Sequence, residues 1–397
     1  MDISSSPPPL APPTSEESQV SWLRLLRSRR VGPATFFRLM TEHGSAEAAL
    51  DALPRMAAEA GLPNYEVCPE GVARAELAAG YRLGAVPIFA GSAADSPLLG
   101  DISDRPVMLW ALGDPALLRR PSIALVGARN ASSVGKRMAR SLANDLGEAG
   151  FVLASGMARG IDAAAHTAAL PTGTIAVLAG GVDVIYPQEN KDLYTQIVRN
   201  GLILSEHPPG FRPMARHFPA RNRIVAGLSR ALVVVEAAAK SGSLITARCA
   251  LDQGREVLAV PGHPFDGRAA GGNLLIRDGA ALVRSAADII EVTGPAPMAQ
   301  DPRQQAFFAP PQAAAPILPP PTGSPAKPRN LTRKILSLLG AAPVSEDQLS
   351  RDLGLPPQAL SRQLTTLEIL GELTRSAGGL VSRTEPLPVD PPRKPLH

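Results

Sequence analysis

The sequence predicts an α/β protein built on an extended Rossmann-like, doubly wound and mainly parallel sheet. A small helical domain is expected before the sheet and a winged-helix domain after it. In the middle of the chain, apolar runs of strand length alternate with helical segments. Strands that are apolar on both faces and alternate with helices form parallel sheets covered by helices. A proline-rich segment then separates this region from a short helical C-terminal stretch.

Composition limits the possible classes of protein. The chain has 397 residues, of which 45% are hydrophobic, enough for a sizeable core. Its net charge is only +4, so any nucleic-acid site should be local. Cys68 and Cys249 lie far apart, which excludes a disulfide framework and argues against structural zinc. The N-terminus lacks the order of a signal peptide and no apolar run reaches membrane-spanning length, so we expect a cytoplasmic protein with no membrane contact.

The first third of the chain predicts a helical domain and a connection. Residues 1–18 are rich in serine and proline and are predicted to be disordered. Residues 19–85 show the apolar spacing of several short helices, interrupted at Gly32-Pro33 and Gly61-Leu62-Pro63. The stretch Val86–Gly113 looks irregular and contains prolines, so we expect residues 86–120 to be a connecting segment packed on the core domain.

Residues 121–293 are predicted to form the Rossmann-like domain. The strand candidates are Ser122–Gly127, Phe151–Ala154, Thr174–Ala179, Leu202–Leu204, Ala231–Val235, Glu256–Val260 and Ala280–Val283. Loops that follow parallel strands meet at one edge of the sheet, where ligands of such sheets bind. The loops after these strands are therefore the candidate site.

The C-terminal region predicts a linker, a winged helix and a tail. Residues 294–328 are dominated by proline, alanine and glutamine, which is typical of a linker. Residues 329–385 predict three helices followed by a hairpin, and residues 386–397 a disordered tail. The helix candidates are Leu331–Leu339, Ser345–Leu353 and Pro357–Leu370, and the hairpin strands are Gly371–Thr374 and Gly378–Val381.

The first strand-end loop runs from Gly127 to Lys136 and leads into an amphipathic helix. A strand, a glycine turn and a helix N-terminus bring backbone N–H groups and the positive helix end to one point, which suits an anion. Arg129 stands where the dinucleotide fingerprint has its second glycine, and a guanidinium can hold a phosphate oxygen itself. An ordinary turn with Arg129 in a structural ion pair is the alternative.

The second loop, Ser155 to Asp162, is also rich in glycine and carries Arg159. Asp162 is expected to cap the helix that follows or to complement its dipole. His166 lies on an alanine-rich helix face and is expected to be a packed core histidine. Gly156 and Arg159 are the candidate ligand contacts of this loop.

The third loop contains Phe218 followed by Arg221, Asn222 and Arg223. These three polar residues are consecutive on a predicted helix, so at most two share a face. An aromatic ring among arginines can stack a base beside phosphate contacts. A solvated basic helix face is the alternative.

The fourth loop contains Lys240, Gly242 and Ser243 at the start of a further helix. A lysine charge, a glycine for close approach and a serine cap form another phosphate-binding helix start. A capped loop without ligand is the alternative here. The last loop runs to Gly271-Gly272-Asn273 and is long and rich in glycine, which suits a surface for an extended ligand.

Basic residues from several of these loops should converge on one sheet edge. They are Arg129, Arg159, Arg221, Arg223 and Lys240. A mononucleotide needs two or three such contacts, whereas a polynucleotide backbone can use more. The pattern therefore favours nucleic acid over a soluble nucleotide.

With these loops in place, the sequence resembles the DNA-processing protein A family, also called Smf. The matching motifs, in order, are Gly127-Ala128-Arg129 with Ser133 and Gly135, Ser155–Asp162, Phe218–Ser229, Val235-Glu236 with Lys240–Ala247, and Gly272-Asn273 with Gly279-Ala280. The resemblance implies single-stranded DNA binding, a homodimer, and loading of the RecA recombinase on incoming DNA, which the protein would protect during natural transformation. With the residue arguments it gives these expected DNA contacts: Gly127, Arg129, Ser133, Gly156, Arg159, Phe218, Arg221, Asn222, Arg223, Lys240, Gly242, Ser243 and Asn273.

The flanking domains match the family as well. The helical domain resembles its N-terminal domain of SAM-like or helix-hairpin-helix type, and the tail resembles the winged helix that some members carry. In the presumed recognition helix, Arg362 is the only basic residue and Glu368 lies nearby, so DNA recognition and partner contact both remain open.

The sequence argues against two enzymatic alternatives. A nucleotide N-glycosidase resembling the lysine-decarboxylase-like phosphoribohydrolases would need a carboxylate in the run from Ser241 to Arg248, which has none. A nicotinamide-dependent dehydrogenase is opposed by Arg129 in the fingerprint. Elsewhere no catalytic constellation, metal-ligand spacing or cofactor motif emerges, so the sequence predicts no catalytic residue, metal or cofactor.

Overall fold

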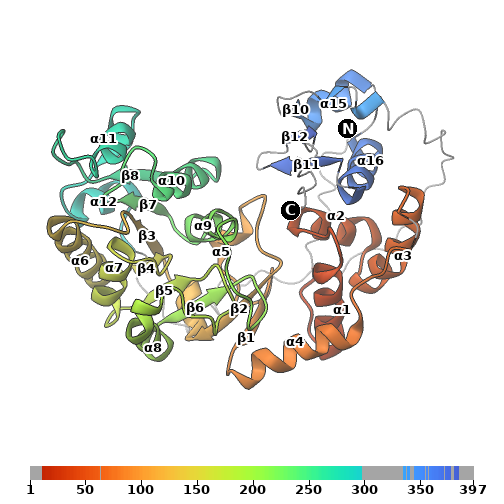
Figure 1. The fold of residues 1–397 in the computed structure, drawn as a ribbon, viewed down its shortest axis with the longest axis horizontal. Helices are drawn as coiled ribbons and strands as arrows, with labels where there is room; N and C mark the ends of the chain where they lie inside the picture. The colour runs from red at the N-terminus through yellow and green to blue at the C-terminus, as the bar shows by residue number, and fades with distance from the viewer. Residues whose placement is uncertain are drawn as a thin grey trace, which may run out of the picture.

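The computed structural model describes residues 11–296 except 63, and residues 334–383 except 337, 340–343, 354, 356, 371 and 377–379. The sheet and its helices form one lobe, and the N-terminal helices with the C-terminal domain form the other (Figure 1). Residues 1–10 of the predicted disordered N-terminus and all of the predicted C-terminal tail lie outside these residues, as does nearly all of the predicted linker. No helix in the described part of the chain is both long and apolar enough to cross a membrane.

The N-terminal domain consists of helices. They are α1 (Glu16–Arg27), α2 (Pro33–His43), α3 (Ala46–Glu59) and α4 (Glu70–Arg82). Helix α1 begins earlier than the predicted first folded residue, because Ser15 and Ser18 form a reciprocal capping box that satisfies its first backbone N–H groups. Gly32-Pro33, predicted as an interruption, is the start of α2, where proline is well tolerated.

The central sheet has nine strands in the order β1-β2-β6-β5-β4-β3-β7-β8-β9. From β6 to β9 all neighbours pair in parallel. These parallel strands are β3 (Ser122–Val126), β4 (Val152–Ser155), β5 (Thr174–Val177), β6 (Leu202–Ser205), β7 (Ala231–Val234), β8 (Glu256–Ala259) and β9 (Ala281–Leu282). Each overlaps a strand predicted from the sequence, and the doubly wound, mainly parallel sheet is confirmed.

The prediction that the stretch Val86–Gly113 is irregular was wrong. That stretch contains β1 (Val86–Phe89) and β2 (Met108–Gly113), which extend the sheet beyond β6. Both are antiparallel, and Trp110 in β2 pairs with Ser205 in β6. Pro87 lies in β1, the edge strand, where a missing backbone N–H is tolerated.

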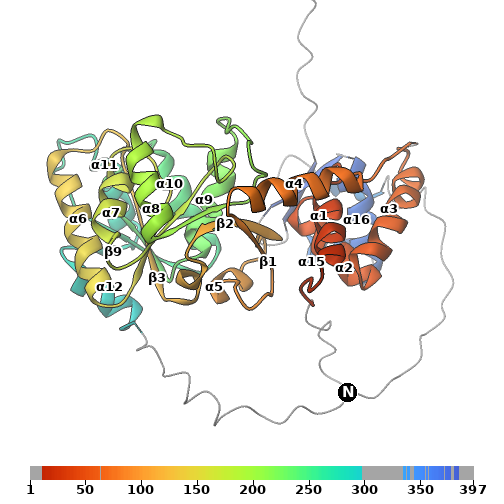
Figure 2. The same ribbon diagram turned by 90° about the horizontal axis from the view of Figure 1, so that it is seen from below.

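Helices cover both faces of the sheet (Figure 2). Helices α6 (Ser133–Glu148), α7 (Ile161–Ala169), α8 (Lys191–Asn200) and α12 (Ala286–Thr293) cover one face. Helices α5 (Pro97–Gly100), α9 (His217–Gly227), α10 (Gly242–Asp252) and α11 (Ala270–Arg277) cover the other. On α7, His166 is fully buried and its Nδ1 lies 2.6 Å from the Thr174 hydroxyl, so it is a core histidine as predicted.

The N-terminal domain shares its core with the sheet. Trp22 of α1 and Trp110 of β2 belong to one cluster of buried residues, which also includes residues of α8. The Trp110 indole N–H donates to Glu76 of α4 at 3.1 Å, and Arg27 of α1 pairs with the same carboxylate at 2.7 Å. The two domains therefore pack as one unit.

The C-terminal domain has a winged-helix pattern. It contains β10 (Val344–Ser345), α15 (Glu346–Leu353), α16 (Pro357–Leu370) and the hairpin β11 (Leu373–Ser376) and β12 (Leu380–Arg383). Of the first predicted helix, Leu331–Leu339, residues 331–333 and 337 lie outside the described residues, and residues 334–336 and 338 are helical. Helix α16 lies against the N-terminal domain, where Glu368 pairs with Arg38 of α2 at 3.1 Å.

Candidate functional site

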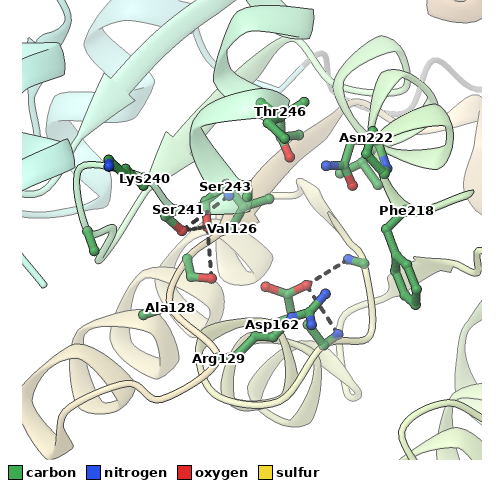
Figure 3. A pocket seen from close by; sticks show the side chains of 18 of the residues that line it. Val126, Ala128, Arg129, Asp162, Phe218, Asn222, Lys240, Ser241, Ser243 and Thr246 are labelled. Carbon is green, nitrogen blue, oxygen red and sulfur yellow. Dashed lines mark hydrogen bonds between the residues drawn. The ribbon is translucent and has the colours of Figure 1, made fainter. Parts of the chain in front are cut away.

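A cavity of about 620 Å³ opens at the carboxyl edge of the sheet. It lies where the strand order reverses, between β4 and β7 on either side of β3, which is where doubly wound sheets bind ligands. Loops after β3, β4 and β7 and the start of α9 supply its walls (Figure 3). The predicted contacts that line it are Gly127, Arg129, Gly156, Phe218, Arg221, Asn222, Lys240, Gly242 and Ser243.

The N-terminus of α10 forms an open wall of this cavity. Ser241 caps the helix by accepting the Ser243 N–H at 3.3 Å. The Ser243 hydroxyl donates to the carbonyl of Gly127 at 2.9 Å, which ties this loop to the one after β3. A Cβ added to Gly242 would meet no atom within 4 Å. Lys240 is exposed beside this turn, so a positive side chain and a positive helix end face the same space.

Arg129 and the Phe218 ring form the opposite wall, and Tyr186 lies next to Phe218. The Arg129 guanidinium lies 5.4 Å from the centre of the Phe218 ring, within the range of a cation–π contact. The ring centres of Phe218 and Tyr186 lie 5.3 Å apart. A second cavity of about 210 Å³ adjoins the first and is lined by Arg129, Phe218 and Tyr186, among others. The two cavities thus share a cationic and aromatic border.

Arg221 lies on the cavity floor and is only 8% exposed. Its Nη1 donates to the carbonyl of Gly156 at 2.6 Å and also to that of Val177. A Cβ at Gly156 would approach this guanidinium to 2.4 Å, which explains the glycine. Burial lowers the pKa of Arg221 to about 10, which leaves it charged at neutral pH. It holds the loop after β4 in place beneath the cavity.

Asp162 fills the turn after β4. Its carboxylate accepts the backbone N–H groups of Gly156 and Ala158, each at 3.2 Å. Burial raises the pKa of Asp162, and the nearby Arg221 charge opposes that shift. Asp162 does not cap α7, because the N-cap Gly160 has no side-chain hydrogen bond, but it lies in the first turn, the position for complementing the helix dipole. It is 5% exposed and faces a buried cation.

Glu236 fills the turn before α6. The backbone N–H of Ser132, the N-cap of α6, donates to Glu236 Oε2 at 2.9 Å, and the Ser132 hydroxyl donates to Oε1. The same hydroxyl accepts the Gly135 N–H at 2.9 Å. The anion at this predicted anion-binding helix start is thus a side chain of the protein itself.

Four predicted contacts do not line the main cavity. Arg159 lines the second cavity and pairs with Glu189 at 3.4 Å. Arg223 holds Glu206 with bonds of 2.6 Å to both carboxylate oxygens, on another side of α9. Asn273 bonds to both backbone groups of Gly262. Ser133 is the first residue of α6, after the Ser132 cap.

Several lining residues were not predicted from the sequence. Thr246 of α10 and Arg268 of the loop after β8 line the main cavity, and Tyr186 lines the second. The Arg268 guanidinium donates two hydrogen bonds to the Asp266 carboxylate, so its charge is already paired. The aromatic residue Tyr186, which precedes Pro187 in a loop after β5, was the available signal for this part of the site.

The cavity retains positive charge after these pairs are counted. The acidic residue among those that line the cavity is Asp162, and its carboxylate faces the Arg221 charge. In the described part of the chain no ion pair neutralises Arg129 or Lys240. Nor does that part hold a group of three or more His, Cys, Asp or Glu side chains placed for a metal ion. The site is suited to an anion held by arginine, lysine and a helix start.

Fold and site together define a Rossmann-like protein with an open ligand site at the switch point of the sheet. The family model of DNA recombination-mediator protein A matches residues 88–294, just over half of the chain. Models of a DprA-like N-terminal HHH domain and a DprA winged helix domain match residues 16–79 and 319–379. The chain belongs to the DNA recombination-mediator protein A family, as the sequence resemblance indicated.

Individual proteins and a solved structure that are similar to this chain support the family assignment. The DNA processing protein DprA of Streptococcus pneumoniae (strain ATCC BAA-255 / R6) is 47% identical over 194 residues, which span 48% of this chain and 68% of that protein. Protein Smf of Escherichia coli (strain K12) is 36% identical over 289 residues, spanning 72% and 74%. The X-ray structure of DprA from Streptococcus pneumoniae has a TM-score of 0.58 and 33% identity, over 70% of this chain and 98% of that one.

Proposed function

We propose that this protein is a recombination mediator that binds single-stranded DNA in the cavity at the switch point. The observation that carries the proposal is the pair of cations Arg129 and Lys240 on opposite walls of one open cavity, for which the described residues supply no ion-pair partner. Backbone phosphates of one strand could reach both, which favours a chain of phosphates over a single one. The open N-terminus of α10 would receive a phosphate beside Lys240.

The aromatic border supplies the second element of the proposal. Phe218 and Tyr186 offer ring faces beside Arg129, and every base has a face that can stack on such rings. Stacking of this kind tolerates any sequence and requires an unpaired base. The combination favours a single strand over a duplex.

The wider role follows from the family. We propose that the protein acts in the cytoplasm as a homodimer, protects incoming single strands during natural transformation and loads RecA onto them. Catalysis is not part of this proposal. A nucleotide N-glycosidase needs a carboxylate at its substrate, and the lining carboxylate of the main cavity, Asp162, is held by two backbone N–H groups and faces Arg221.

The test is a titration of fluorescent oligo-dT and of a duplex at two salt concentrations. We expect single strands to bind more tightly, with free mononucleotides competing poorly. Lys240→Ala should weaken oligo-dT binding by about 1–3 kcal/mol and reduce the salt dependence. Arg140→Ala removes an exposed charge from α6, away from the cavity, and should leave affinity unchanged.

Two outcomes would contradict the proposal. Unchanged oligo-dT affinity in the Lys240 variant would show that the strand binds elsewhere. Equal competition by mononucleotides would favour the nucleotide-binding alternative.

A further inference from the structure

The start of α6 has the components of a nucleotide-phosphate site. It follows the first parallel strand of the domain, contains glycines at Gly127 and Gly135, and has a serine cap. Helix starts of this kind accept phosphate through backbone N–H groups and the positive helix end. In this protein the position is occupied.

The occupant is the carboxylate of Glu236, which follows β7. It accepts hydrogen bonds from both the backbone and the hydroxyl of Ser132. The carboxylate is also in close contact with the helix, because a Cβ built on Gly135 would lie 2.4 Å from the Glu236 carboxyl carbon and within 2.7 Å of both its oxygens. No space is left there for a phosphate.

We propose that Glu236 is a specificity-determining residue that serves as a built-in anion at α6 and keeps the diphosphate of free nucleotides out of this turn. The carboxylate has the charge and the acceptor oxygens that a phosphate would supply, so the helix start is satisfied without a ligand. An incoming diphosphate would meet both the filled volume and a like charge. Phosphates are then directed to the open start of α10. Arg129 lies in the same turn, but the inference concerns the Ser132 cap and first backbone N–H groups of α6 and can be tested without DNA.

The experiment is an anion rescue. Glu236→Ala leaves the α6 start without its acceptor and should lower the unfolding midpoint by roughly 2–8 °C, as for a lost N-cap. Inorganic pyrophosphate should then restore most of that loss, because its oxygens can occupy the vacated position. ADP should act in the same way, and the wild-type midpoint should respond to either anion much less than the variant does.

A matched control is Asp288→Ala. Asp288 accepts the backbone N–H of Ser285 at 3.0 Å at the exposed start of α12, in a capping box outside any glycine-rich strand-end turn. Its loss should also lower the midpoint, but pyrophosphate should shift that variant no more than the wild type. The control separates a general effect of polyvalent anions from binding at α6.

Further arms keep the test decisive. Glu236→Gln retains the side-chain volume, so pyrophosphate should not rescue it. If Glu236→Ala does not fold in plain buffer, refolding with pyrophosphate is compared with refolding in chloride of equal ionic strength, and recovery only with pyrophosphate supports the proposal. Equal yields in both salts, or an alanine variant with a wild-type response to pyrophosphate, would overturn it. Oligo-dT affinity is measured separately, so loss of the DNA proposal would leave this result intact.

Discussion

The starts of α6 and α10 are built from the same components but differ in what lies in front of them. Each follows a parallel strand, and each has a serine cap and a glycine in its first turn. At α6 the space in front is filled by Glu236, whereas at α10 it opens into the cavity beside Lys240. The turn after β4 resembles the α6 start, because a carboxylate of the protein, that of Asp162, occupies it. A glycine-rich turn therefore marks a ligand site only where the protein has not supplied the anion itself.

The largest expected effect is on the filled turn after β4. Asp162→Ala leaves Arg221 buried without its facing carboxylate and two backbone N–H groups without their acceptor. We expect a loss of roughly 3–5 kcal/mol in the free energy of unfolding, measured by urea denaturation. Asp162→Asn keeps the shape and should lose less. Wild-type stability in the alanine variant would mean that this turn is not held by its carboxylate.

Mild acid should also lower the stability of the folded protein, because His166 of α7 is buried in its neutral form near the filled turn. Burial lowers the pKa of His166 to about 3, and the Arg221 charge adds to that shift. Between the unfolded value near 6.5 and about 3, the unfolded chain binds a proton that the folded chain does not, so stability falls as the pH falls. The difference between wild type and His166→Gln should change by up to about 1.4 kcal/mol per pH unit from pH 6.5 downward. Parallel pH curves would contradict this.

A smaller effect should separate the two glycines at the helix starts. Gly135→Ala puts a Cβ against the Glu236 carboxylate and should cost about 1–3 kcal/mol of stability, as overpacking does. Gly242→Ala meets no atom and should change stability by less than about 0.5 kcal/mol. Chemical denaturation of both variants tests the comparison directly. Equal losses of stability in the two variants would show that the space in front of α6 is no more occupied than the space in front of α10.

The smallest expected effect lies within the open site. Arg129→Ala and Phe218→Ala should each weaken oligo-dT binding, because one removes a phosphate contact and the other a stacking face. Since the guanidinium lies over the ring, the two losses should not add. A double-mutant cycle should give a coupling energy of about 0.5–1 kcal/mol. If the two losses of binding free energy were strictly additive, the two side chains would contribute to oligo-dT binding independently.

Much of the fold was predictable because its strands are short and buried on both faces. The parallel strands from β3 to β9 were all located in this way. Strands β1 and β2 were missed, because β2 pairs with β6 far away in the sequence and Pro87 breaks the local pattern of β1. Edge pairing of this kind depends on the assembled sheet, and no local spacing reports it.

The site was predictable to the extent that strand ends determine it. The loops that carry Arg129, Phe218 and Lys240 meet because parallel strands end at one edge. What the sequence did not reveal was which cations are already paired. Arg221 and Arg223 are two positions apart on α9, so they point to different sides, one to the cavity floor and one to Glu206. That distinction depends on carboxylates from other elements.

Both tryptophans of the chain, Trp22 and Trp110, lie in the apolar cluster that joins the N-terminal domain to the sheet. Neither lines the cavity at the switch point. Intrinsic fluorescence will therefore report separation of these two domains and will be nearly silent when a strand enters the site. The protein thus carries its own optical probe of domain docking, while a binding assay needs a label on the DNA.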